Sequence, residues 1–238
     1  MQDGVRDALF ATTHISYRPA TVGMTPRFTR RQAWQLGAVL LGGFMVGRGA
    51  HWFAPVGRDI GRSDTVAAIL DGTESPESGP NDATLSLAVF SDYRCPACRT
   101  AFPALEAALR GDGKVRVIYK DWPIFGAASK RAAQVALASA AQGIYPAVHR
   151  ALMMDDRRID DVMLQDVVTG AGGDWMRVTR DLARDGTAMM DRLRENGREA
   201  LSIGLTGTPG YLAGPILQLG ALDSAGFARL FARARAEP

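Results

Sequence analysis

Residues 90–98, Phe90-Ser91-Asp92-Tyr93-Arg94-Cys95-Pro96-Ala97-Cys98, decide the fold and hold both cysteines of this 238-residue chain. The segment 85–90 is short, apolar and bounded by turn-forming residues, which is typical of a buried strand. Pro96 suits the first turn of a helix, since its missing N–H is not needed there, and apolar residues follow at helical spacing. Residues 115–119 predict a second strand. The order strand–CxxC–helix–strand indicates a right-handed βαβ unit.

The spacing of Cys95 and Cys98 predicts redox chemistry. At the start of a helix, the dipole and the unpaired backbone N–H groups favour a thiolate, which is the attacking species in disulfide exchange. Cys98 lies one turn further on the same helical face. We therefore expect Cys95 to be the nucleophile and Cys98 to resolve the mixed disulfide, with Pro96 and Ala97 as the spacer of the active site.

Three other interpretations compete with redox chemistry. A zinc half-site would need two more ligands, and the chain has no second cysteine pair. A structural disulfide across so short a loop would add little stability. Two buried free thiols would leave the position of the motif at a strand–helix junction unexplained. We expect neither a metal nor a cofactor.

The rest of the chain is mostly helical. Residues 57–83 are polar and rich in turn-formers, which predicts a linker with a turn or two of helix at 65–70. A turn-forming segment at 206–210 precedes a hairpin of strands 211–213 and 216–219, and residues 227–234 predict a last helix. The expected helices between are 130–142, capped by Ser129, then 146–154, 160–169, 174–184 and 187–203. The charged residues 154–158 read as a solvated loop.

Residues 90–98 and Thr206-Gly207-Thr208-Pro209 together resemble the two active-site segments of the DsbA-like branch of the thioredoxin superfamily. Residues 120–126 also resemble that branch, and the similarity covers about residues 64–236. The resemblance implies an α/β, thioredoxin-like fold with an inserted all-helical domain. The thioredoxin-like domain would comprise residues 84–125 and 204–238, and the inserted domain residues 126–203.

The resemblance also implies a cis peptide bond at Thr208–Pro209 that faces the disulfide, in a loop that presents backbone groups to the substrate chain. Strong oxidants of the family often carry histidine where this chain has Ala97. We therefore predict a reduction potential between those of thioredoxin and DsbA. Gly210 is expected to leave the floor of the substrate groove bare. Asp92 is expected to be a turn or cap residue rather than a proton carrier for Cys98.

Residues 1–56 form a separate N-terminal region. Arg27, Arg30 and Arg31 precede the apolar stretch 33–46, which is the pattern of a secretory signal or a membrane anchor. The stretch is shorter than the ~20 residues that span a bilayer, so cleaved and anchored forms both stay open, as does a start at Met1 or Met24. We expect a periplasmic protein, tethered to the inner membrane or secreted after signal cleavage.

These patterns predict a thiol–disulfide oxidoreductase that introduces or exchanges disulfides in exported, cysteine-containing client proteins. The resemblance implies a membrane redox partner, an oxidase or a reductase. The alternatives are a disulfide isomerase or reductase, and a redox-inert chaperone with a thioredoxin fold. The excess of positive charge lies in residues 1–62, which hold eight arginines against three aspartates. The remainder of the chain is slightly acidic, so the expected domain lacks the basic face that binding of nucleic acid requires, and we exclude a nucleic-acid partner.

Overall fold

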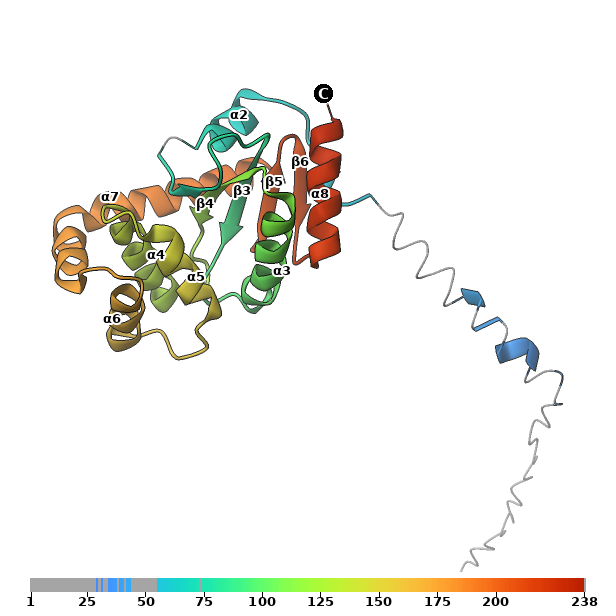
Figure 1. Ribbon diagram of the computed structural model, residues 1–238, viewed down its shortest axis with the longest axis horizontal. Helices are drawn as coiled ribbons and strands as arrows, with labels where there is room; N and C mark the ends of the chain where they lie inside the picture. The colour runs from blue at the N-terminus through green and yellow to red at the C-terminus, as the bar shows by residue number, and fades with distance from the viewer. Residues whose placement is uncertain are drawn as a thin grey trace, which may run out of the picture. The chain divides into compact units, whose positions relative to one another are not determined.

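A six-stranded mixed sheet, with strands in the order β1-β6-β5-β3-β4-β2, forms the centre of the folded part of the chain (Figure 1). The strands are β1 (Arg58–Asp59), β2 (Glu77–Ser78), β3 (Leu85–Ser91), β4 (Val115–Asp121), β5 (Gly210–Ala213) and β6 (Ile216–Leu219). The computed structural model describes residues 55–72 and 74–237 and, nearer the N-terminus, residues 29, 31, 34–37, 39–40 and 42–43.

The strand–helix–strand unit predicted around the cysteines is present. Strand β3 leads into α3 (Pro96–Asp112), and β4 returns parallel to β3 with Val117 opposite Leu87. On its other edge β3 pairs antiparallel with β5, where Tyr211 lies opposite Val89. Strand β3 is thus central, and the strand end that carries the CxxC motif is fixed by pairing on both sides.

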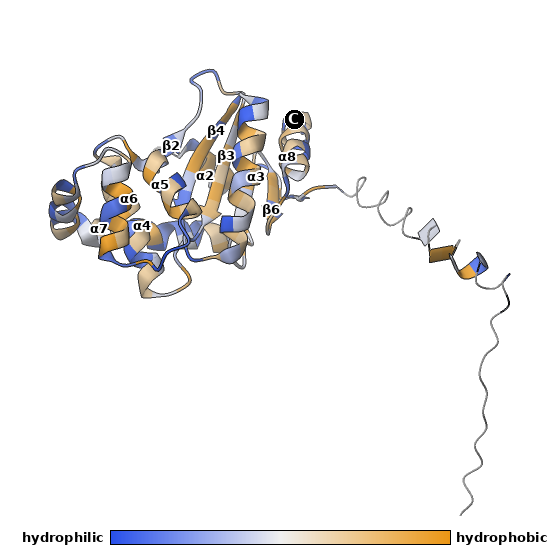
Figure 2. Cartoon of the chain, turned by 60° about the horizontal axis from the view of Figure 1, so that its bottom comes forward, coloured by the Kyte–Doolittle hydropathy of each residue, from blue (hydrophilic) through white to orange (hydrophobic). Residues whose placement is uncertain are grey.

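Both faces of β3 are covered by helices. Leu87 and Val89 pack into a core with α3 and α8 (Ser224–Ala236). Their neighbours Ala88 and Phe90 point the other way, into a core with α2 (Asp64–Asp71) and the end of α7 (Trp175–Ser202). This two-sided burial explains why residues 87–90 of β3 are all apolar rather than alternating, in line with the colour of the strand in Figure 2.

The helices between β4 and β5 form a second core. They are α4 (Ala127–Ala140), α5 (Tyr145–Met154), α6 (Asp161–Gly170) and α7. Helix α7 runs without a break through Gly186, although two helices were expected there. It packs along α4, and the Gln134 amide donates to the Gly186 carbonyl at 3.2 Å, so tertiary contacts outweigh the low helix propensity of glycine. Helix α4 begins at Ala127, so Ser129 is not its cap.

The expected linker, residues 57–83, is largely part of the fold. Strand β1 pairs with β6 and β2 pairs with β4, so the two strands close opposite edges of the sheet. Along the chain, helix α2 lies between these two strands, and it buries Val66 and Ile69. Strands of two residues are too short to show a period in the sequence, and the loops around them carry the turn residues that suggested a linker.

The N-terminal unit, residues 1–54, is described at few positions. The expected signal or anchor stretch, residues 33–46, lies partly outside the described residues, and those of its positions that are described are helical. Of the helices that the structure describes, none has the length and apolar character needed to span a membrane.

Replacing Ile69 by alanine tests whether α2 belongs to the fold. Ile69 is 1% exposed and packs against the sheet, so Ile69→Ala should lower the free energy of unfolding by about 2–5 kcal/mol. The measurement is urea unfolding followed by circular dichroism. Leu201→Ala, at a position that is 62% exposed, is the control and should change stability by about 0.5 kcal/mol or less. Equal stability of the two variants would contradict the packing of α2.

Candidate active site

Cys95 lies at the junction of strand and helix. It follows β3 by a turn closed by the Cys95 N–H and the Asp92 carbonyl at 3.1 Å, and it is the N-cap of α3. The Cys98 backbone N–H donates to Cys95 Sγ at 3.4 Å. Both cysteines are free thiols and almost fully buried. The first sulfur therefore sits where unpaired helix N–H groups stabilise negative charge, as the sequence predicts.

The proline loop faces this sulfur. The peptide bond Thr208–Pro209 is cis, as the resemblance implies. The Cys95 thiol donates to the Thr208 carbonyl at 3.3 Å, across 113 residues of chain. The expected site residues are thus together: Cys95, Cys98, Thr208 and Pro209 meet at one end of β3. The spacer residues Pro96 and Ala97 are exposed beside them.

Gly210 does not leave the groove floor bare. It is buried at the start of β5, and a Cβ built on it would lie 2.5 Å from Cδ2 of Leu205. The Leu205 side chain already fills the space that a larger residue would occupy. The expectation of a bare floor is therefore wrong, because Leu205 packs against the backbone of Gly210.

The two thiols have different surroundings. Burial raises the pKa of the Cys98 thiol far above its ordinary value, and hydrogen bonding from the Asp92 backbone offsets this only in part. Cys98 therefore holds its proton strongly in the reduced state. Cys95 has the helix N–H group and the Thr208 carbonyl around its sulfur. This asymmetry agrees with Cys95 as the attacking sulfur and Cys98 as the resolving one.

The buried carboxylate of Asp92 holds the site together through hydrogen bonds. Its Oδ1 accepts from the Arg94 N–H at 2.7 Å and from the Ser129 hydroxyl at 2.6 Å. Its Oδ2 accepts from the N–H groups of Ile124 and Phe125, at 2.7 and 2.9 Å. Both oxygens are fully used, so Asp92 acts as an anchor, in line with the turn interpretation. Its distant partners, on α4 and the loop after β4, had no signal in the sequence.

A buried polar cluster that the sequence analysis missed adjoins the cysteines. The Tyr93 hydroxyl lies 2.9 Å from His149 Nδ1, and the Tyr145 hydroxyl donates to Asp121 Oδ2 at 2.8 Å. The Tyr119 ring contacts the His149 ring at a centroid distance of 4.6 Å. Tyr93, Tyr145 and the sulfurs share one core cluster. The four-residue spacing of positions 145 and 149, on one helix face, was the only hint in the sequence.

Burial sets the charges within this cluster. It raises the pKa of Asp121 from 3.8 to about 7, against opposing hydrogen bonds from Tyr145 and Tyr93. It lowers the pKa of His149 from 6.5 to about 3. His149 Nδ1 and Asp121 Oδ1 are 4.0 Å apart, but the imidazole is neutral at pH 7, so this contact is not an ion pair.

Removing the Asp92 carboxylate should destabilise the fold. Asp92→Ala leaves the Ser129 hydroxyl and three backbone N–H groups without their acceptor in a buried site, so we expect a loss of about 3 kcal/mol or more. Urea unfolding measures it. Asp191→Ala is the matched control, because its exposed pair with Arg194 contributes about 0.5 kcal/mol. A loss at Asp92 no larger than at Asp191 would refute the anchoring role.

The pH dependence of stability should change when Asp121 is replaced. Because the folded pKa of about 7 exceeds the ordinary 3.8, the folded state binds the extra proton, and ionisation costs stability as the pH rises through this window. Asp121→Asn cannot ionise. The free energy of unfolding of the variant relative to the wild type should rise from pH 4 to pH 7, by up to about 1.4 kcal/mol per pH unit. A flat difference over this range would contradict the raised pKa.

The contribution of His149 to stability should depend on pH in the opposite direction from that of Asp121. Its folded pKa of about 3 lies below the ordinary 6.5, so the unfolded state binds the extra proton and stability is lost as the pH falls from about 6.5. His149→Gln removes that loss. The stability of the variant relative to the wild type should therefore rise as the pH falls from 6.5 to 4, in the same unfolding series. A relative stability that falls in acid would refute the neutral imidazole.

Several solved structures of other proteins are similar to the fold of this chain. A thioredoxin-like oxidoreductase from Silicibacter pomeroyi DSS-3 has a TM-score of 0.68 at 26% identity, covering 75% of this chain and 100% of that one. The catalytic domain of Proteus mirabilis ScsC gives 0.63 at 26% identity, with 73% and 98% covered. A periplasmic thioredoxin-like protein from Salmonella enterica serovar Typhimurium gives 0.63 at 26% identity, with 74% and 99% covered. No curated protein sequence matches the chain.

A family model covers most of the folded part of the chain. Residues 86–232 match the DSBA-like thioredoxin domain, which spans β3 to α8 and includes the helices α4 to α7. The expected α/β, thioredoxin-like fold with inserted helices is thereby confirmed. The chain belongs to the DsbA-like family of thiol–disulfide oxidoreductases.

Proposed function

We propose that this protein is a protein disulfide oxidoreductase that oxidises cysteine pairs in exported client proteins through Cys95 and Cys98. The observation that carries the proposal is the position of Cys95 Sγ, which meets both the Cys98 N–H and the carbonyl beside the cis proline. The first contact stabilises a thiolate. The second places a backbone acceptor where an extended client chain would pair with the Thr208–Pro209 loop.

The exchange proceeds in two steps. In the oxidised protein, a client thiolate attacks Cys95 Sγ, the Cys95–Cys98 bond breaks, and Cys98 leaves as a thiolate that takes up a proton. The second client thiolate then attacks the client sulfur of the mixed disulfide, and Cys95 leaves as a thiolate. The client loses two electrons and the protein gains them. A membrane oxidase would remove them again to restore the Cys95–Cys98 disulfide.

The surroundings of the two sulfurs support this direction. The Cys98 N–H donates to Cys95 Sγ, and a hydrogen bond to a thiolate favours the reduced form of the pair. Stabilising the reduced form makes a disulfide more oxidising. Ala97 supplies no positive charge to the Cys95 thiolate, which limits this effect, so a potential between those of thioredoxin and DsbA stays our prediction.

Export of the protein, which we also propose, fits the same function. The arginines and apolar stretch near the N-terminus have the pattern of a signal or anchor, and a similar structure belongs to a periplasmic protein. Disulfides persist in that compartment. A protein whose two cysteines both lie in the active site also has no other thiol that can pair wrongly.

Trapping of mixed disulfides tests the proposal. Disulfide exchange is reversible, so the Cys95 thiolate can attack a client disulfide and form a mixed disulfide, with the other client sulfur leaving as a thiolate. Cys98→Ser removes the sulfur that would resolve this adduct, so client proteins should accumulate on Cys95 as adducts that a reductant releases. Cys95→Ser is the matched control and should trap few or none. Full-length variants are exported, the samples are quenched with acid and alkylated, and adducts are identified by mass spectrometry. A folded, exported Cys98→Ser protein without adducts would rule out the proposed role.

The equilibrium of the cysteine pair with glutathione separates oxidase from reductase. An oxidase should have a potential well above about −270 mV, the value for thioredoxin. A potential at or below that value would favour the reductase interpretation. Client binding that persists with both cysteines replaced by serine, without redox exchange in the wild type, would favour the chaperone.

A further inference from the structure

A groove lies directly beside the CxxC motif, on the side of the inserted helices. It has a volume of about 790 Å³, within the range typical of ligand sites. One wall is the first turn of α3 with Pro96, next to the reactive sulfur, and the other is the loop that joins α5 to α6. Residues 156–158, part of the segment 154–158 that the sequence indicates to be a solvated charged loop, thus border the candidate active site.

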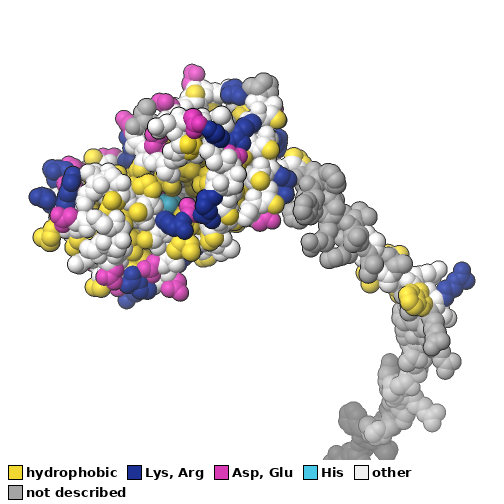
Figure 3. Space-filling view, in the orientation of Figure 1, with side chains coloured by type: hydrophobic (Ala, Val, Ile, Leu, Met, Phe, Trp, Pro, Cys, Tyr) yellow, Lys and Arg dark blue, Asp and Glu magenta, His cyan; other side chains and the backbone are white. Residues whose placement is uncertain are grey.

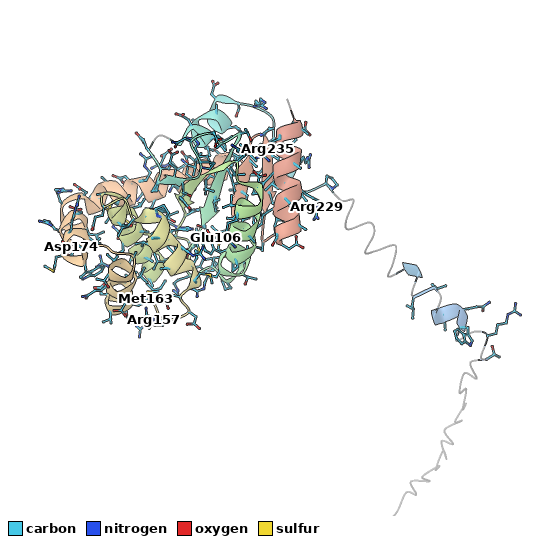
Figure 4. All side chains as sticks on the ribbon, in the orientation of Figure 1. Glu106, Arg157, Met163, Asp174, Arg229 and Arg235 are labelled. Atoms are coloured by element: carbon cyan, nitrogen blue, oxygen red, sulfur yellow. The ribbon has the colours of Figure 1, made fainter. Side chains whose placement is uncertain are left out.

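The lining of this groove is basic. Four arginines line it against a single carboxylate, Asp156. Arg94 and Arg99 come from the motif and the first turn of α3, and Arg157 and Arg158 from the opposite loop. Figure 4 labels Arg157 at the lower edge of the folded part, where Figure 3 shows basic and acidic side chains together.

Only one of the four arginines is neutralised by close carboxylates. Arg157 bonds Asp155 at 2.7 Å and Asp166 at 2.8 Å. By contrast, Arg94 donates to the Phe125 carbonyl at 3.0 Å and Arg99 to the Leu152 carbonyl at 3.4 Å. In the described residues 55–72 and 74–237, no ion pair within 4.0 Å involves Arg94, Arg99 or Arg158, although Asp155 and Arg99 attract each other over a longer distance. Backbone carbonyls orient the guanidinium groups of Arg94 and Arg99 without cancelling their charge.

We propose that this groove binds client segments that carry carboxylates beside the reacting cysteine. The inference rests on the proposed function and adds a substrate class to it. A client whose sulfur meets Cys95 has its neighbouring residues next to Pro96, at the mouth of the groove. Glutamate or aspartate there would meet Arg99 and Arg158 from opposite walls. Charge complementarity of this kind mainly raises the rate of association and makes it depend on salt.

Reduced peptides of equal length test the groove. Each carries two cysteines, flanked by glutamate, glutamine or lysine, and each is mixed with the oxidised full-length protein at about 20 mM and about 500 mM salt. The second-order rate constant comes from acid-quenched samples analysed by mass spectrometry. At low salt the glutamate peptide should react about tenfold faster than the lysine peptide, and the ratio should approach one at high salt.

Substitutions assign the effect to the groove. The double change Arg99→Gln and Arg158→Gln should reduce the glutamate-to-lysine ratio to about twofold. Arg99→Lys keeps the charge and should keep most of the ratio. Arg110→Gln, on the last turn of α3 outside the groove, removes an equal charge and should leave the ratio unchanged. Arg158→Gln alone lies on an exposed loop and should still lower the ratio if the double variant folds poorly.

The outcomes separate the two proposals. If no peptide is oxidised, the proposed function fails and the groove proposal fails with it. If all three peptides react at equal rates, or if Arg110→Gln lowers the ratio as much as the groove variants, the groove proposal alone is overturned. Reduced glutathione is a further arm. If its rate depends on Arg99 and Arg158 while the peptide rates do not, the groove serves a small anionic thiol and the proposal for client segments is overturned.

Discussion

The buried carboxylate of Asp92 is the constraint on which the site depends. It joins three segments that are distant in sequence: the turn before the cysteines, the loop after β4, and α4 through Ser129. These segments belong to both the sheet and the inserted helices. A single side chain therefore ties the start of α4 and the loop after β4 to the turn before the CxxC motif. A charged acceptor makes such bonds strong, and their loss is correspondingly costly.

The reactive sulfurs lie between two regions of opposite electrostatic character. On the inner side, burial lowers the pKa of His149 and raises the pKa of Asp121, so both side chains favour their neutral forms. On the outer side, arginines without close carboxylates border Pro96. Negative charge is thus disfavoured inside, where Cys98 holds its proton, and favoured outside, where Cys95 meets its substrate. This division gives the two cysteines different surroundings without a charged residue in the Pro96-Ala97 spacer.

Local signals made much of the fold predictable. The βαβ unit and the hairpin have short-range markers, such as Pro96 after a strand, whereas the cis bond before Pro209 was implied by the resemblance of residues 206–209 to a family segment. Features that depend on contacts between distant residues have no such marker in the sequence. Strands β1 and β2 are each two residues long and exist only because they extend existing edges. Helix α7 continues through Gly186 because α4 packs along it, which no propensity at that position reveals.

The same distinction between local signals and distant contacts explains which residues of the site could be predicted. Cys95, Cys98 and Pro209 were predicted because each belongs to a motif, whereas Tyr145 and His149 act only through the contacts that folding gives them. Arg99 illustrates the point. On the sequence it is one more charge on a helix; in the structure its guanidinium is bound to a carbonyl on α5 and so faces the groove beside the nucleophile. A backbone acceptor holds the group in place yet leaves its charge intact. The selectivity that we propose for anionic clients therefore depends on tertiary packing and has no motif of its own.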